Sequence, residues 1–271
     1  MRCRFRFPCL VLLAASFPLL AAEEPATEPA PVSSPARRIW EQGQHAMRVG
    51  QPDKAIACYE QSLALDPQFA QAHLSLAAVR LELGDDDGAC PHLRRYVDAR
   101  PEESAVRGHY AELLFRLKHF DEARTQFERF VVDAQETGRP ATKSLLHGHS
   151  RLVEIAERAD EAYEEHLHRG IGLVLLARAR AELIGDEEDP MQESLLCKAA
   201  GELTLALQER SDEARPCWYL HEVWSALGQR SLATRWLRDA RAAAPFSYLT
   251  PTERRSLQLA TYHSAAGTTR R

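Results

Sequence analysis

Apolar residues recur along most of the chain with the three- and four-residue spacing of amphipathic helices. Between residues 36 and 137 these helical segments are short, and brief turns that contain Gly or Pro separate them. Further helical segments are expected at 141–158, 160–183 and 192–209 and from 213 onward. Ala, Leu, Arg and Glu are abundant, and these residues lose little rotamer freedom in a helix. The pattern therefore predicts an all-α protein.

Several positions repeat at an interval of 34 residues, and such a period decides the architecture. A 34-residue unit of helix, turn and helix cannot bury its own apolar face, so the units must stack. The repeating columns are Asp53, Asp87 and Asp121; Ala55, Ala89 and Ala123; Tyr59, Leu93 and Phe127; Gly50 and Gly84; and Pro67 and Pro101.

Each column has an expected physical role. The Asp is predicted to cap the start of a helix, and the Ala to let two helices approach closely. The aromatic residue or Leu fills the space between hairpins. The Gly ends the preceding helix in a left-handed conformation, and the Pro closes the second helix because it cannot continue one.

These columns resemble the tetratricopeptide repeat family, with repeats one to three over 36–137 and a further repeat over 213–247. In that last repeat Gly228, Ala233, Leu237 and Pro245 reproduce the spacing of the first. Repeat three departs from the pattern, because Lys118 replaces the turn Gly and no Pro closes it. The resemblance covers about half of the chain. It implies a right-handed α-solenoid of antiparallel helix pairs with a concave groove.

The middle of the chain, 138–212, is less regular. Ala123 and Ala233 lie 110 residues apart, which is eight more than three periods. We interpret the acidic stretch 184–191 as an inserted loop that proteases should cut first. Successive helices in such a stack alternate in direction, so three predicted helices in this region would invert the last repeat. Two explanations avoid this: either Gly170-Ile171-Gly172 breaks the long helix in two, or the stack is discontinuous near Gly138-Arg139-Pro140. We favour the discontinuity, with Gly172 as a small packing residue.

Both ends of the chain have distinct patterns. Arg2, Arg4 and Arg6 precede an apolar run, and small residues end it at Ala22. This layout predicts a signal peptide over 1–22 and export to the periplasm or the cell exterior, with no membrane span after cleavage. Residues 23–35 are rich in Pro, Ala and Glu and are predicted to be a disordered tether. At the other end, 248–271, Thr250-Pro251-Thr252-Glu253 predicts a capping box and a helix that covers the stack.

The charge pattern bears on the type of partner, and the cysteine content bears on possible disulfides. The net charge is −5 with both signs scattered, so we predict no nucleic-acid partner. Four cysteines remain after signal cleavage, and an even number permits disulfides in an oxidising compartment. We favour buried free thiols, while the pairs Cys58–Cys90 and Cys197–Cys217 stay open.

Histidines in the middle helices are the main candidates for chemistry. His147 and His149, like His166 and His168, are two residues apart and point to opposite sides of a helix. His149 and His168 could meet across a helix pair, either as part of a metal site or as a buried hydrogen-bonded pair. Cys217 with His221, and the run Asp85-Asp86-Asp87, are better explained by packing and by a helix start. We predict no metal and no cofactor.

The concave groove is the favoured site. The family resemblance places the inward positions on the first helix of each repeat. A carboxylate clamp for chaperone tails is disfavoured, because the chain has no Asn and carries Trp and Gln at the clamp positions of the first repeat. The predicted groove residues are Trp40, Gln44, Met47, Leu74, Ala78, Leu81, Gly108, Glu112, Phe115, Trp218 and Glu222.

The sequence thus predicts a non-enzymatic scaffold that binds a peptide or helix of an unidentified partner protein. Two alternatives remain open. Convergence of His149, His168 and a Glu on one cavity would favour a metal protein or an enzyme. A featureless, highly charged groove would favour a structural spacer of an envelope assembly.

Overall fold

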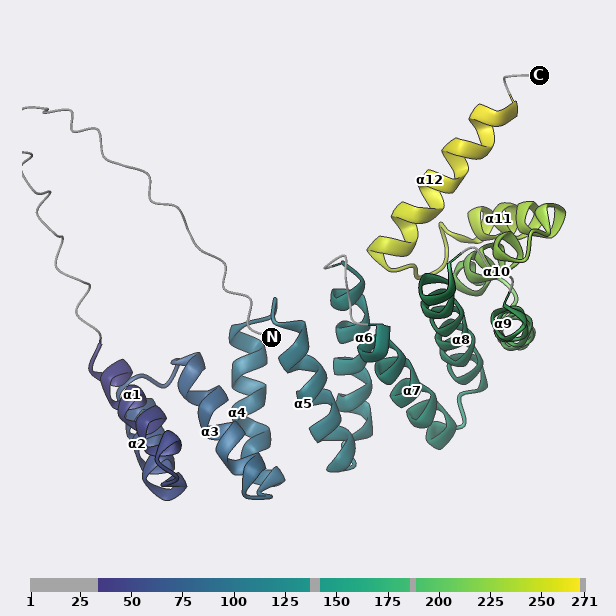
Figure 1. The fold of residues 1–271 in the computed structure, drawn as a ribbon. Helices are drawn as coiled ribbons and strands as arrows, with labels where there is room; N and C mark the ends of the chain where they lie inside the picture. Colours follow the sequence, from purple (N-terminus) through teal and green to yellow (C-terminus); the bar gives the residue numbers. More distant parts are fainter. Residues whose placement is uncertain (1–33, 137–141, 186–188, 269–271) are drawn as a thin grey trace, which may run out of the picture. The chain divides into compact units, whose positions relative to one another are not determined.

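The computed structural model describes residues 34–136, 142–185 and 189–268, with side chains to residue 260. The chain divides into two units, 1–34 and 35–271, and all the described helices lie in the second. In this part of the chain twelve α-helices and no strands are present (Figure 1). They are α1 (Pro35–Arg48), α2 (Pro52–Leu65), α3 (Ala70–Glu82), α4 (Asp86–Ala99), α5 (Ser104–Arg116), α6 (Phe120–Glu136), α7 (Thr142–Ala159), α8 (Ala162–Ile184), α9 (Pro190–Glu209), α10 (Ala214–Ala226), α11 (Arg230–Ala243) and α12 (Pro251–Thr268).

The helices form hairpins that pack side by side in chain order. The closest pairs are α1 with α2, α3 with α4, α5 with α6, α7 with α8, α8 with α9, and α10 with α11. Each hairpin also contacts the next, because α2 packs on α3, α4 on α5 and α6 on α7. This is the all-helical, tetratricopeptide-like stack of paired helices that the 34-residue period predicts.

The turns within five of these helix pairs, all except α8 with α9, have the same backbone conformation. The central residue of each has a positive φ, and the two amide groups at this turn donate to carbonyls near the end of the first helix. Gly is favoured here because a Cβ is strained in the left-handed region. Lys118 nevertheless adopts it with φ 63°. The five residues at this position are Gly50, Gly84, Lys118, Asp160 and Gly228.

The packing columns are buried as predicted. Ala55, Ala89 and Ala123 are completely inaccessible, and Tyr59 and Phe127 are among the largest fully buried side chains. The Asp column does not cap the helices, which corrects our expectation. Each Asp is the second residue of its helix instead, where a carboxylate is stabilised by the N-terminal end of the dipole. In α4 the residue that caps the helix is Asp85, whose side chain accepts from the Gly88 amide.

The turn at Asp160 identifies a fourth regular hairpin, α7 with α8. It follows the turn at Lys118 by 42 residues, and it precedes the turn at Gly228 by 68 residues, which is two periods. The eight extra residues therefore lie between these two turns, where α6 and α7 have 17 and 18 residues against 14 and 13 in α4 and α5, and not in the acidic stretch 184–191, as we had interpreted. The proposed break near Gly138-Arg139-Pro140 lies in the segment 137–141, which is outside the described residues.

An odd helix interrupts the alternation after the fourth hairpin. α8 runs without a break through Gly170-Ile171-Gly172, so this tripeptide does not divide it. Our packing argument for Gly172 was wrong, because a Cβ there would meet nothing within 4 Å. Gly170 is the packing residue: a Cβ there would lie 2.7 Å from Leu203 Cγ. Along the sequence, the two long helices α8 and α9 thus replace three shorter helices of the regular repeat.

The connection between α8 and α9 spans the predicted acidic loop, of which 186–188 lie outside the described residues. Asp189 accepts from the Met191 amide and so caps α9. Its carboxylate also accepts two hydrogen bonds from Arg180 on α8, at 2.6 and 3.2 Å. This ion pair fixes the start of α9 against the last turns of α8.

The predicted capping box at the start of α12 is confirmed. The Glu253 amide donates to Thr250 Oγ1 at 3.2 Å, and the Thr250 amide donates to Glu253 Oε2 at 2.9 Å. α12 contacts α6, α10 and α11 (Figure 1). The start of this segment also contacts a helix more than 100 residues earlier, because Thr250 Oγ1 donates to Gln135 Oε1 on α6 at 3.4 Å.

The four described cysteines are free thiols. Cys217 is buried and Cys58 and Cys90 are half-buried, as expected of small apolar residues, but Cys197 is exposed on α9. The expectation of burial was therefore wrong for Cys197. Among the described residues, no helix has the length and apolar character needed to cross a membrane.

Candidate partner-binding site

Two predicted groove residues of the first repeat are hydrogen-bonded to the same hydroxyl group on the neighbouring helix α3. Trp40 Nε1 and Gln44 Nε2 both donate to Ser75 Oγ on α3, each at 2.9 Å. The Trp40 ring also meets Phe69 edge-to-face, with 5.7 Å between ring centroids. Trp40 and Met47 pack against a small apolar cluster around Tyr59. These side chains are half-buried and join α1 to α3, so their polar atoms are already satisfied.

The other predicted positions have different surroundings. Leu74 and Leu81 are half-buried against the main core, and Ala78 is exposed on the same helix. Gly108 is a packing position, because a Cβ there would lie 3.0 Å from the Phe130 ring. Trp218 is 5% exposed and belongs to the core, which corrects its assignment to the groove.

Glu222, the last predicted position, lies on α10 and pairs with Arg178 of α8. Burial raises its pKa to about 7, although Arg178 acts in the opposite direction. This carboxyl group is therefore committed to a contact between two helices of the stack and is not offered to a partner.

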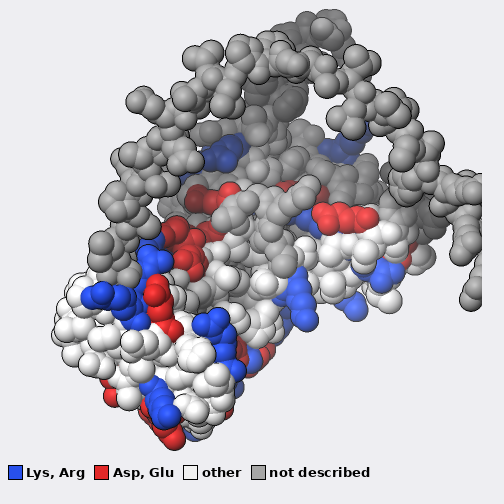
Figure 2. All heavy atoms as spheres, turned by 60° about the vertical axis from the view of Figure 1, so that its left-hand side comes forward, with Lys and Arg blue, Asp and Glu red and all other residues white. Residues whose placement is uncertain are grey.

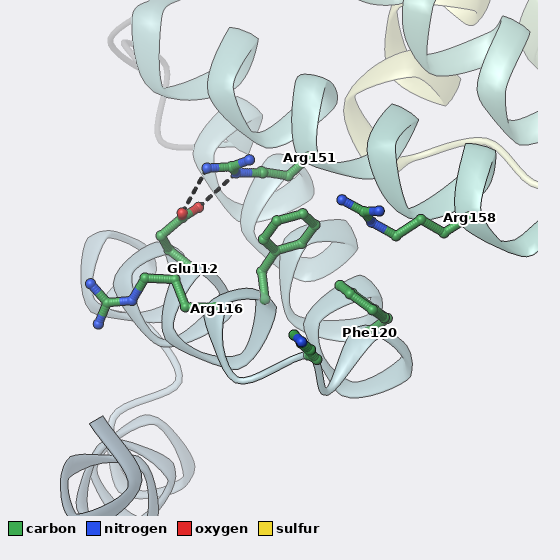
Figure 3. A pocket seen from close by; sticks show the side chains of 7 residues that line it. Glu112, Arg116, Phe120, Arg151 and Arg158 are labelled. Carbon is green, nitrogen blue, oxygen red and sulfur yellow. Dashed lines mark hydrogen bonds and ion pairs between the residues drawn. The ribbon is translucent and has the colours of Figure 1, made fainter. Parts of the chain in front are cut away.

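A cavity of about 590 Å³ opens beside Glu112 and Phe115 at the junction of α5, α6 and α7 (Figure 3). We call it the Phe115 cavity. Two aromatic rings form its apolar part: Phe115 and Phe120 meet edge-to-face with 5.4 Å between their centroids. The lining residues are Glu112, Phe115, Arg116, Lys118, Phe120, Arg151 and Arg158.

Arg151 and Glu112 form the rigid side of the Phe115 cavity. Arg151 donates to both carboxylate oxygens of Glu112, at 2.8 and 2.9 Å (Figure 3). It also donates to Glu154. Such bidentate pairs fix geometry as well as charge. Burial alone would raise the Glu112 pKa, but hydrogen bonds from Arg151 and His147 hold it below its usual value. Arg151 also lies 4.5 Å above the Phe115 ring centroid.

Positive charge exceeds negative charge around this cavity. Arg116 points away from Arg158 and pairs with Asp86 at 2.7 Å (Figure 3). Arg158 stacks on both rings, 5.2 Å from Phe120 and 5.7 Å from Phe115. Among the residues that the structure describes, neither the Arg158 nor the Lys118 side chain makes a hydrogen bond or an ion pair. The cavity thus combines exposed aromatic edges with two cations that have no carboxylate partner.

Sequence reasoning identified only two members of this site, Glu112 and Phe115. It missed Phe120 and Lys118 because they occupy the turn, which was treated only as a departure from the Gly consensus. It missed Arg151 and Arg158 because the extra residues in α6 and α7 hid the fourth hairpin. Aligning the turn at Asp160 with the turn at Lys118 is the signal that would have placed both arginines on an inward helix.

The histidines of the middle helices form a buried pair. His149 Nδ1 and His168 Nδ1 lie 3.0 Å apart, and both side chains are at most 4% exposed. Burial lowers the pKa of His149 to about 3 and lowers that of His168 well below its usual value. Both rings are therefore neutral near pH 7. Within the described ranges, no group of three or more His, Cys, Asp or Glu side chains is arranged to hold a metal ion.

His147 and His166, the other members of the two His pairs, lie on the opposite sides of their helices. His147 contacts Glu112 at 2.9 Å, and His166 contacts Glu202 at 2.7 Å. Convergence of His149, His168 and a Glu on one cavity, which would favour a metal protein or an enzyme, is found only in part. His168, Glu128 and Glu164 share a cavity, but His149 does not line it.

Charged side chains elsewhere are mixed in sign. On the face shown in Figure 2, described basic and acidic side chains are intermingled over α1 to α4 and the helices behind them. Several form cross-helix pairs, such as Arg80 with Glu60 at 3.1 Å. Such exposed pairs contribute little stability individually. The Phe115 cavity differs because its two cations are unpaired and adjoin apolar rings.

Comparison with known proteins agrees with the repeat geometry. Residues 41–104 match the family model described as tetratricopeptide repeat. Similar solved structures include MamA, with 13% identity over 77% of this chain and 91% of that chain and a TM-score of 0.39. PilF of Pseudomonas aeruginosa shows 17% identity over 83% and 96%, with a TM-score of 0.37. The tetratricopeptide protein YrrB shows 15% identity over 78% and 87%, with a TM-score of 0.36.

Residues 41–104 thus match the tetratricopeptide repeat: the match covers α2, α3 and α4 with more than half of α1, and the same hairpin turn recurs to Gly228. Repeats of this class typically serve as non-enzymatic scaffolds for contacts between proteins.

Proposed function

We propose that the protein is a scaffold that binds a segment of a partner protein at the Phe115 cavity. The observation that carries this proposal is the cluster of Phe115, Phe120 and Arg158, where partly exposed rings lie beside a cation without a partner. Partially buried aromatic and Arg side chains are the residues that most often dominate binding energy at interfaces.

The charges of the cavity favour an acidic segment that carries an apolar side chain. The apolar side chain would pack on the edges of Phe115 and Phe120. A neighbouring Asp or Glu of the partner would pair with Arg158 or Lys118, which lack carboxylate partners in the described part of the chain. The Arg151–Glu112 pair holds the wall in place and leaves little charge of its own to attract a ligand.

Leu74, Ala78 and Leu81 extend the proposed surface along α3. Trp40, Gln44 and Met47 support it from the first repeat, where they hold α1 against α3 through Ser75 and the Tyr59 cluster. Their contribution to a partner is therefore expected to be smaller than that of Phe115.

Fluorescence polarisation with labelled peptides tests the proposal. A peptide with one Phe flanked by Asp and Glu should bind, and its binding should weaken with salt because the charges are partly exposed. Replacing its acids by Asn and Gln, or changing Arg158→Glu, should weaken binding at least about tenfold. Arg129→Glu, on the exposed side of α6, is the matched control. Equal binding of the acidic and neutral peptides would contradict the proposed partner chemistry.

We also propose that the protein is exported, on the basis of its basic start, short apolar run and small residues before Glu23. Residues 1–33 lie outside the described part of the chain. N-terminal sequencing of the mature protein should begin near Glu23. Recovery of chains that retain Met1 from a soluble cytosolic fraction would contradict export.

A further inference from the structure

A second cavity lies on a different set of helices, between α6, α8 and α10. Its volume is about 320 Å³. None of its lining residues belongs to the Phe115 cavity, so it is separate from the partner site proposed above. The lining residues are Glu128, Val131, Val132, Glu164, His168, Arg215 and Tyr248.

Arg215 supplies hydrogen-bond donors to this cavity. Its side chain comes from α10 and is about nine-tenths buried. Only Nε is engaged in the described structure, donating to Glu253 Oε1 at 2.9 Å. Glu253 is itself held by the Tyr219 hydroxyl and the Thr250 amide. A guanidinium has four further N–H donors on its Nη atoms, and here they have no protein acceptor among the described residues.

Two carboxylates line the same cavity without pairing with Arg215. Glu128, on α6, makes no hydrogen bond or ion pair within the described residues. Glu164, on α8, makes only long contacts, 3.5 Å to Arg210 and 3.8 Å to His168 Nε2. Burial raises the pKa of both carboxyl groups. The buried guanidinium of Arg215, the half-buried Glu164 and the more exposed Glu128 therefore line one cavity, and neither carboxylate contacts Arg215 directly.

We propose that this cavity binds a free α-amino acid as its zwitterion. The ligand carboxylate would accept hydrogen bonds from the Nη atoms of Arg215. The ligand ammonium would lie between Glu128 and Glu164, where it relieves their mutual repulsion. An apolar ligand side chain fits the wall formed by Val131 and Val132. Both ligand charges contribute: the carboxylate satisfies the buried Nη donors of Arg215, and the ammonium offsets the negative charge of Glu128 and Glu164.

Isothermal titration calorimetry on the full-length mature protein tests this inference, with L-leucine, L-isoleucine and L-phenylalanine as probes. At least one should bind saturably. L-Leucinamide lacks the carboxylate and N-acetyl-L-leucine lacks the ammonium, so each should bind at least about tenfold more weakly than L-leucine. Glu128→Gln should weaken amino-acid binding by a similar factor, and Glu122→Gln, an exposed change on the same helix, should leave it unchanged.

Three results would overturn the inference. The first is no binding of any probe with a Kd below about 1 mM. The second is equal binding of L-leucinamide and L-leucine, which would indicate a plain cation site. The third is unchanged binding in Glu128→Gln. Because Glu128 is exposed at its outer side and unpaired, this variant is expected to fold. A melting curve of each variant verifies that its fold is intact.

Discussion

The Nδ1 atoms of His149 and His168 lie 3.0 Å apart, in the same repeat position that His73 and His92 occupy two hairpins earlier. Both pairs are separated by 19 residues and join the two helices of one hairpin. In the hairpin between them, Arg107 and Gln126 fill this position, and Arg107 Nη1 donates to Gln126 Oε1 at 3.2 Å. A polar contact at one fixed place thus links the helices of three successive hairpins.

The buried histidines predict that the protein loses stability in mild acid. Burial lowers the pKa of His92 to about 4 and that of His149 to about 3, below the value of about 6.5 in the unfolded chain. The unfolded chain therefore binds more protons than the folded chain below pH 6.5. The stability is fully present above that pH and should fall by about 1.4 kcal/mol per pH unit for each such histidine.

Urea unfolding at pH 7, 6 and 5 measures this loss. His149→Gln should lose less stability between pH 7 and 5 than the wild type, because one titrating group is gone. His109→Gln changes an exposed histidine and should follow the wild type. Parallel slopes for His149→Gln and the wild type would show that His149 is not the group that titrates.

Lys118→Gly should stabilise the protein by about 1 kcal/mol. Lys118 holds a positive φ where three other hairpins have Gly, and the left-handed region is unfavourable for a residue with a Cβ. Thermal or urea unfolding measures the gain. Gly84→Ala, the reverse change at the equivalent turn, should destabilise by a similar amount. A Lys118→Gly variant that is less stable than the wild type would mean that the Lys side chain stabilises the turn by contacts that outweigh this strain.

Glu253→Gln should destabilise the protein by about 3–5 kcal/mol, because it leaves the buried charge of Arg215 without its partner. Burial disfavours the charged guanidinium, yet the neighbouring Glu253 carboxylate raises the Arg215 pKa above its usual value. The double variant Glu253→Leu with Arg215→Met should recover part of the loss. Glu60→Gln, in the exposed pair with Arg80, should cost less than about 1 kcal/mol. A loss for Glu253→Gln no larger than for Glu60→Gln would refute this role.

Truncation of the packing column should cost more stability than truncation of the Phe115 cavity. Tyr59→Ala and Phe127→Ala remove side chains that are at most 1% exposed and should cost about 3–5 kcal/mol. Phe115→Ala should cost clearly less, since its ring is only half-buried, while reducing peptide binding. Trp40→Ala should lie between them, because Trp40 packs on the Tyr59 cluster and donates to Ser75. Thermal melts of the four variants give the order, and a Phe115→Ala loss equal to that of Phe127→Ala would place Phe115 in the core.

The sequence by itself determined the repeat, and through it the fold. The Ala column, the Tyr59 and Phe127 column and the turn glycines are local requirements of a close-packed hairpin, so they are visible at a fixed period. The capping box at Thr250 and Glu253 was equally visible, because its contacts span only three residues.

Only the tertiary structure decided where the eight extra residues lie and which side chains meet. The spacing of columns cannot locate an insertion when Asp160 stands at a turn that Gly usually marks. The Phe115 cavity depends on Arg151 and Arg158 from the next hairpin, and the second cavity depends on Arg215 and Glu128 from helices far apart in sequence. Such contacts follow from how hairpins stack, and they leave no local periodicity to be recognised.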